Sequence, residues 1–126
     1  MIVNPWRTFR EPERSREYLA LLSELPLKSF RHVGLFLHYS GLIQKQLRTV
    51  QGILGYSVAV RPLQKRFWTL SVWESEAALG QFVGAAPHSQ VMDAMSGKMG
   101  KTRFVKWTIR GADCPPAWAA ALERRD

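Results

Sequence analysis

Hydrophobic and polar positions along the chain follow two different periods. In the stretch Phe67–Glu74, apolar residues alternate with small hydroxyl residues at period two, which predicts a β-strand. Between residues 31 and 50 the spacing changes to three and four residues, which is one face of a helix. The positions that carry this helical spacing are Val33, Phe36, Leu37, Ser40, Ile43, Leu47 and Val50. Gly52 is expected to end the helix.

The other segments follow the same two periods and complete an ordered set of elements. We expect strands at 18–25, 52–62, 66–74 and 102–109, and helices at 75–83, 87–95 and 117–124. Ser75 is a natural N-cap, and Pro87 stands where a second helical segment would begin. The order strand, helix, strand, strand, helix, strand predicts an α+β fold, a ferredoxin-like βαββαβ sandwich with a four-stranded antiparallel sheet. Its second sheet face needs a cover, and a second copy of the chain would supply it.

The length of 126 residues fits one domain with a core of its own. We expect an N-terminal arm over residues 1–16, packed through Trp6 and Phe9, a domain over 17–110, and a helical tail over 111–126. Neither a membrane-spanning run nor a signal peptide is evident. The single cysteine, Cys114, excludes an internal disulfide, so we expect a cytoplasmic protein.

The net charge of +8 does not by itself identify a partner. The basic residues are scattered, and only Lys65-Arg66 and the segment 98–110 look clustered. They are not interleaved with an aromatic platform, so we rank a nucleic-acid partner lowest. A solvated basic surface is the simplest interpretation, and the charge would also steer an anionic substrate towards the protein.

The stretch from Phe67 to Glu74, the following helix and the pair Pro87-His88 together resemble the antibiotic biosynthesis monooxygenases of the dimeric α/β-barrel superfamily. The resemblance covers roughly residues 17–110 and includes the Gly52–Val60 segment. It implies a homodimer whose two sheets form a barrel, with a pocket in each subunit between sheet and helices. Members include cofactor-independent oxygenases, polyketide cyclases and haem-degrading enzymes, so the fold alone does not settle the activity.

The resemblance also implies a role for particular residues. His88 matches the histidine that acts as the base in members similar to olivetolic acid cyclase. Those members carry a tyrosine six residues earlier, where this chain has Phe82. Haem-degrading members carry an axial histidine about four residues later, where this chain has Met92. Haem ligation by His32, His38 or His88 stays open, but we expect no bound organic cofactor.

The alternation of the Phe67–Glu74 strand separates two kinds of side chain. One face mixes aromatic rings and hydroxyls, as the wall of a pocket for a planar ligand would, and the other is wholly apolar. The mixed face holds Phe67, Thr69, Ser71 and Trp73. We add Phe82 of the 75–83 helix, Trp107 of the last strand, and His38 and Tyr39 of the first helix as candidate substrate-binding residues. The alternative is that these residues simply fill the core.

These observations favour a small dimeric monooxygenase-like enzyme or a cyclase that acts on an aromatic or polyketide-like compound, with His88 as its base. The alternative is a protein of the same fold that binds a small molecule or haem without turnover. We find no phosphate-binding glycine loop, paired carboxylates or dinucleotide-binding fingerprint.

Overall fold

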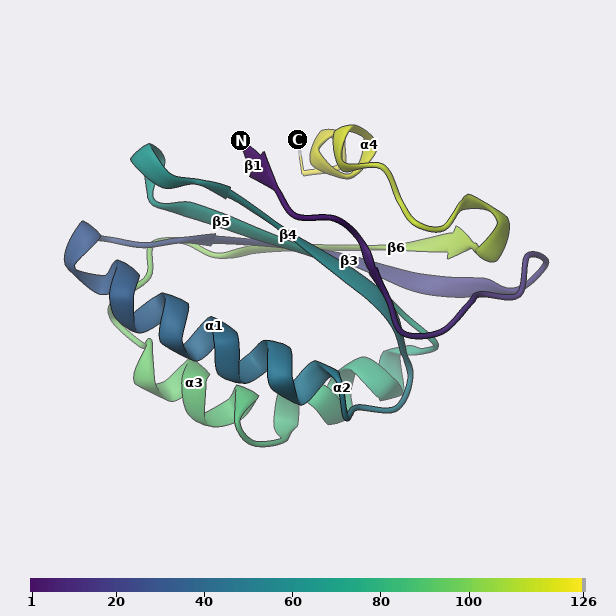
Figure 1. Ribbon diagram of the computed structural model, residues 1–126, viewed down its shortest axis with the longest axis horizontal. Coiled ribbons are helices and arrows are strands. Elements are labelled where there is room, and N and C mark those ends of the chain that lie inside the picture. Colours follow the sequence, from purple (N-terminus) through teal and green to yellow (C-terminus); the bar gives the residue numbers. More distant parts are fainter. Residues whose placement is uncertain (126) are drawn as a thin grey trace.

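The computed structural model describes residues 1–125 and is built around one antiparallel sheet (Figure 1). The four long strands lie in the order β4 (Ile53–Arg61), β5 (Arg66–Trp73), β3 (Glu17–Pro26) and β6 (Arg103–Arg110). Two short strands of the N-terminal arm, β1 (Ile2–Val3) and β2 (Arg7–Thr8), pair with the outer edge of β4. The sequence did not reveal β1 and β2, because two exposed residues each are too few to show a period.

Three helices cover one face of the sheet, namely α1 (Val33–Leu47), α2 (Glu76–Gly84) and α3 (His88–Ala94) (Figure 1). The fourth, α4 (Trp118–Glu123), lies on the opposite face beside the N-terminal arm. Single 3-10 turns occupy Phe30–His32, Pro62–Gln64 and Gly111–Asp113. The predicted α+β, ferredoxin-like βαββαβ order is therefore confirmed.

The predicted N-cap of α2 is confirmed, whereas α1 ends at Leu47, five residues before the Gly52 that was expected to end it. The Ser75 side chain accepts a hydrogen bond from the Ala78 backbone N–H at 3.1 Å, which caps α2. After α1 the chain turns at Gly52, whose φ of +91° suits glycine. A Cβ there would lie 2.5 Å from that of Ala78, so a side chain would push α2 away from the start of β4.

Strand register assigns the two faces of β5. One side of β5 faces α1–α3, and we call this side of the sheet the helix face. Phe67 packs there with Val91 and Met95, and Trp73 packs there with Leu79 and Phe82. Trp68, Leu70 and Val72 pack on the other side, beneath the arm and the tail, which we call the arm–tail face. Alternation separated these sets correctly, and the structure adds that the set with hydroxyls faces the helices.

The arm–tail face is covered by the two ends of the same chain. Trp6 of the arm and Trp118, Ala121 and Leu122 of the tail pack on it. Gly55 permits this approach, because a Cβ there would lie 2.6 Å from Nε1 of Trp6. The chain therefore supplies a cover of its own on this face, where the sequence led us to expect that a second copy would supply it. The homodimer itself stays a prediction.

Ser57 ties the arm to the tail above β4. Its hydroxyl donates to the Asn4 carbonyl at 2.7 Å and accepts from the Trp118 indole N–H at 3.2 Å. A second tie involves Glu24 of β3, which is only 3% exposed. One of its oxygens accepts from Nε1 of Trp68 at 3.1 Å and from Arg125 at 2.7 Å, and Arg66 lies 3.6 Å away. A buried carboxylate needs such partners, so the tail and the sheet depend on each other here.

Within residues 1–125, no helix is both long and apolar enough to cross a lipid bilayer.

Candidate active site

His88 is the first residue of α3 and is anchored to α1 and to the end of α2. Its backbone N–H donates to Oε1 of Gln46 at 3.1 Å. Its Nδ1 lies 3.1 Å from the carbonyl oxygen of Val83. Because a carbonyl can only accept, Nδ1 carries the proton in this pair, and Nε2 then keeps its lone pair. The local fold therefore fixes the tautomer that a general base requires.

The electrostatics of His88 point the same way. The side chain is half-buried, and burial lowers its pKa below the ordinary value, while the hydrogen bond to Val83 raises it by a smaller amount. The imidazole is therefore neutral at neutral pH. A place at a helix N-terminus also disfavours added positive charge, but burial is the first cause of the lowered pKa.

A column of side chains leads from His88 into the sheet. The His88 ring lies 4.8 Å from the ring centre of Phe82, which in turn lies 5.2 Å from that of Trp73. Nε1 of Trp73 donates to the hydroxyl of Ser71 at 2.9 Å. We call these four residues, Ser71, Trp73, Phe82 and His88, the His88 column. The structure thus brings four of the predicted site residues together.

Phe67 and Tyr39 lie elsewhere on the helix face. Phe67 packs against Phe36 with ring centres 4.3 Å apart, in the cluster to which the half-buried Tyr39 also belongs. Thr69 lies between Phe67 and Ser71 on β5 and is half-buried. These three residues line the same layer as the His88 column without extending it.

Two predicted site residues point away from this layer. His38 is exposed on α1, with its ring 5.5 Å from that of its neighbour Tyr39. Trp107 lies on the arm–tail face, where it is the register partner of Ala20 and lies beneath Arg124, 4.8 Å from its ring centre. The prediction that Trp107 joins the same wall as Trp73 was wrong, because alternation along β6 places it on the opposite side of the sheet.

Two glutamines of α1 were missed by the sequence reasoning. Gln46 is 9% exposed, and its amide group contacts both the His88 backbone N–H and, at 3.4 Å, the Phe82 carbonyl. Gln44 accepts a hydrogen bond from the Tyr56 hydroxyl at 3.0 Å. A signal for Gln46 existed, because it directly precedes Leu47 and lies three residues after Ile43 on the apolar face.

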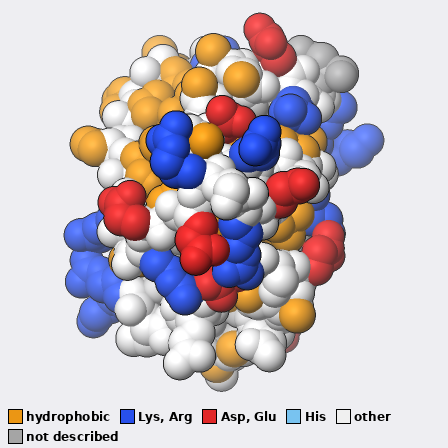
Figure 2. Space-filling view, turned by 90° about the vertical axis from the view of Figure 1, so that its right-hand side faces the viewer, with side chains coloured by type: hydrophobic (Ala, Val, Ile, Leu, Met, Phe, Trp, Pro, Cys, Tyr) orange, Lys and Arg blue, Asp and Glu red, His pale blue; other side chains and the backbone are white. Residues whose placement is uncertain are grey.

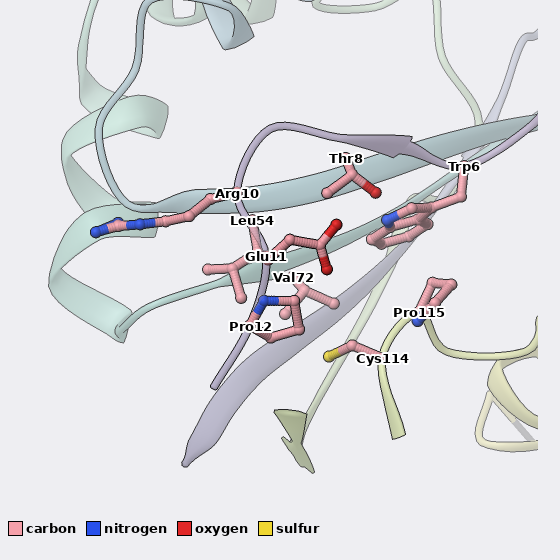
Figure 3. A pocket seen from close by; sticks show the side chains of 9 residues that line it. All are labelled: Trp6, Thr8, Arg10, Glu11, Pro12, Leu54, Val72, Cys114 and Pro115. Atoms are coloured by element: carbon pink, nitrogen blue, oxygen red, sulfur yellow. The ribbon is translucent and has the colours of Figure 1, made fainter. Parts of the chain in front are cut away.

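Two cavities are found away from the His88 column. A small one of about 40 Å³ lies on the arm–tail face, and Thr8, Glu11 and Cys114 are among the residues that line it (Figure 3). A larger groove of about 520 Å³ lies beside the end of α1. His88 lines neither of them. Burial, followed by the nearby charge of Asp113, raises the pKa of the Cys114 thiol, which makes it a poor nucleophile.

The acidic, histidine and cysteine side chains of the described residues form no metal site. Among residues 1–125 there is no group of three or more histidine, cysteine, aspartate or glutamate side chains that could hold a metal ion. Figure 2 shows acidic and basic side chains interspersed on the face of the molecule that it presents. That face offers no uniform basic track for nucleic acid.

No protein family model and no curated protein matches the sequence. Among solved structures, one named an antibiotic biosynthesis monooxygenase superposes with a TM-score of 0.64 at 13% identity, over 71% of this chain and 95% of that chain. The chain has the same fold. A protein from Pseudomonas aeruginosa, PA3566, gives a TM-score of 0.65 at 14% identity, over 75% of this chain and 96% of that chain.

A longer protein shares the fold as well. A provisionally named monooxygenase from Fusobacterium nucleatum has a TM-score of 0.70 at 8% identity, over 82% of this chain and 48% of that chain. This chain thus spans about half of that protein. At these identities the likeness concerns the fold alone, and any activity has to be argued from the site.

Proposed function

We propose that the protein is a monooxygenase-like enzyme that oxidises a hydrophobic aromatic or polyketide-like compound, with His88 as its general base. The observation that supports this best is the fixed tautomer of His88, whose Nδ1 is held by the Val83 carbonyl. The fold shared with monooxygenase-named structures gives independent support. The Phe82 ring beside the imidazole, with Trp73 packed behind Phe82, gives apolar surroundings that suit a planar, apolar substrate.

The chemistry requires only a base and dioxygen. Nε2 of His88 takes a proton from a carbon that is activated by a neighbouring carbonyl. The electron pair left on that carbon forms a bond to dioxygen, and the resulting peroxide anion takes the proton back. Loss of water removes the second hydrogen of the carbon and the outer oxygen, and a new carbonyl remains. Dioxygen is the oxidant, and the substrate carbon supplies all the electrons, so the step balances without a reductant.

Gln46 and the aromatic residues of the His88 column have separate tasks in this proposal. Gln46 holds the start of α3 through the His88 N–H, so it positions the base without touching the substrate. Phe82 and Trp73 exclude water from the deprotonated carbon, where a low dielectric strengthens the interaction with the imidazolium. In a cyclase, the same base would remove the same kind of proton, and the carbanion would close a ring by an aldol step instead of meeting dioxygen.

Anthrone is a suitable probe, because its methylene group lies between two aromatic rings and is activated by the ring carbonyl. We expect the protein to accelerate dioxygen uptake and formation of anthraquinone, measured with an oxygen electrode and by absorbance. His88→Gln should lower the rate by about 10²–10⁴-fold, the usual contribution of a general base. The matched control is His32→Gln, which removes a histidine at the start of α1. Equal rates in the His88 and His32 variants would refute the catalytic role.

A binding protein without turnover is the second candidate. It is favoured by the absence of another acid or base in the His88 column, since position 82 carries a phenylalanine and the Ser71 hydroxyl is engaged by Trp73. Nε2 of His88 is the atom that would ligate haem iron, whereas Met92 is 52% exposed and supplies no imidazole. Titration with haemin distinguishes a haem-binding protein from an oxygenating enzyme. A Soret shift that His88→Gln abolishes would indicate haem binding and not oxygenation.

A further inference from the structure

A groove of about 520 Å³ beside the end of α1 has the size of a small-molecule site. It lies between the N-terminal arm, the α1–β4 connection and the end of β5. Its apolar lining consists of Phe9, Leu47, Val50 and Ile53. Its charged lining consists of Arg10, Arg48 and Glu74. Because Leu47 and Ile53 are buried, the open lining is largely polar, and the half-buried Phe9 and Val50 form its apolar part. Such a mixed lining suits an amphipathic ligand.

The aromatic wall of this groove is held in place before any ligand arrives. The Phe9 ring stacks on Tyr56 with ring centres 5.8 Å apart and an interplanar angle of 25°. The Phe9 backbone N–H donates to the Leu54 carbonyl at 2.8 Å, which anchors the arm on β4. A preformed wall lowers the entropy cost of binding a flat ring.

One of the positive charges in the groove has no ion-pair partner among the described residues. Arg10 extends away from Trp6 and Cys114 (Figure 3) and forms an ion pair with Glu74, so these two charges cancel. Arg48 is exposed, and among residues 1–125 no ion pair to it is formed. A guanidinium beside apolar side chains can bind a carboxylate through two parallel hydrogen bonds.

We propose that this groove binds a small aromatic carboxylic acid, with its ring against Phe9 and Val50 and its carboxylate on Arg48. The groove is next to the His88 column along the chain. Leu47 follows Gln46, which holds His88, and Glu74 follows Trp73. Binding there does not depend on His88 acting as a base, so the two proposals stand or fall separately.

The test compares two ligands of one shape that differ in charge, 1-naphthylacetic acid and its primary amide. Isothermal titration calorimetry at low salt gives the affinity ratio of acid to amide for the whole chain. We expect a ratio of about three to ten in the unmodified protein, as for a partly exposed charge pair. The ratio should fall to about one in Arg48→Gln, whereas the affinity for the amide stays the same.

Arg31→Gln is the matched control, because it removes an exposed arginine near the opposite end of α1 and should leave the ratio unchanged. Amide chemical shifts in a ¹H–¹⁵N spectrum locate the ligand, and we expect the changes at Gln51, Gly52 and Ile53. The proposal is overturned if neither ligand binds saturably, if acid and amide bind equally in the unmodified protein, or if Arg48→Gln and Arg31→Gln behave alike. Shifts confined to other parts of the sheet would overturn it as well.

Discussion

Both faces of the sheet bury aromatic side chains, but the two faces are built in different ways. The helix face is covered by α1–α3, which are joined to the strands by short connections, and it holds the His88 column. The arm–tail face is covered by the two chain ends, through pairs such as Arg125 with Glu24, which are 101 residues apart, and Trp118 with Ser57, which are 61 apart. The helix face places a base beside an aromatic ring, and on the arm–tail face the chain ends shield the sheet from water.

The helix face therefore holds a candidate site, whereas the polar groups of the arm–tail face hold the tail in place. On the helix face, His88 is half-buried and its Nε2 is left for chemistry. On the arm–tail face, the buried Glu24 is bonded to Trp68 and Arg125, so it is engaged in holding the tail. A buried carboxylate in a small basic protein therefore serves the fold here, and the half-buried histidine is the better candidate for catalysis.

The largest expected effect comes from removing one tryptophan of each face. Trp68→Ala and Trp73→Ala should each cost about 3–5 kcal/mol of unfolding free energy, because both side chains are 1% exposed. Trp68→Ala should be at the higher end, since it also removes a hydrogen-bond donor to the buried Glu24. Urea unfolding followed by circular dichroism measures both. A loss below about 1 kcal/mol for Trp68→Ala would mean that the tail does not seal this face.

A smaller effect is expected at Glu24 and tests the tie between sheet and tail. Glu24→Ala should cost about 2–3 kcal/mol, because the Trp68 indole N–H is left buried without an acceptor. Glu24→Gln keeps an acceptor and removes only the charge, so it should cost about 1 kcal/mol, as Arg66 and Arg125 can turn towards water. Thermal unfolding of both variants gives the comparison. Equal losses would show that charge, and not the hydrogen bond to Trp68, makes the tie.

The smallest effect concerns the pH dependence that His88 gives to the helix face. Burial lowers its pKa, so the unfolded chain binds the proton more readily than the folded one. The contribution of neutral His88 to stability is therefore complete above the ordinary histidine pKa. It is lost as the pH falls from there through the lower pKa that His88 has in the folded protein. The melting temperature of the unmodified protein should therefore fall more between pH 7.5 and 5 than that of His88→Gln. Parallel curves would contradict the burial of this imidazole.

Much of the fold could be predicted from the sequence, and less of the site. Period-two and helical spacing gave the order of the elements, and alternation sorted Trp68, Leu70 and Val72 from Ser71 and Trp73. The Pro87-His88 pair placed a histidine at the start of α3. The apolar helix face marked Gln46 as a buried position, but its partners, the Phe82 carbonyl and the His88 N–H, are about 40 residues away along the chain, so no local pattern could identify them.

The sequence by itself determined which residues share a face of each strand or helix, because side-chain direction follows from the local backbone geometry. Only the tertiary structure decided what lies against each face. It put the hydroxyl-bearing side of β5 under the helices, Trp107 on the opposite side, and the chain's own ends where a second copy was expected. The physical reason is that the hydrophobic effect has no direction, so any apolar cover stabilises an apolar face. The segment that covers it is selected by long-range packing and by specific partners such as Glu24 with Arg125.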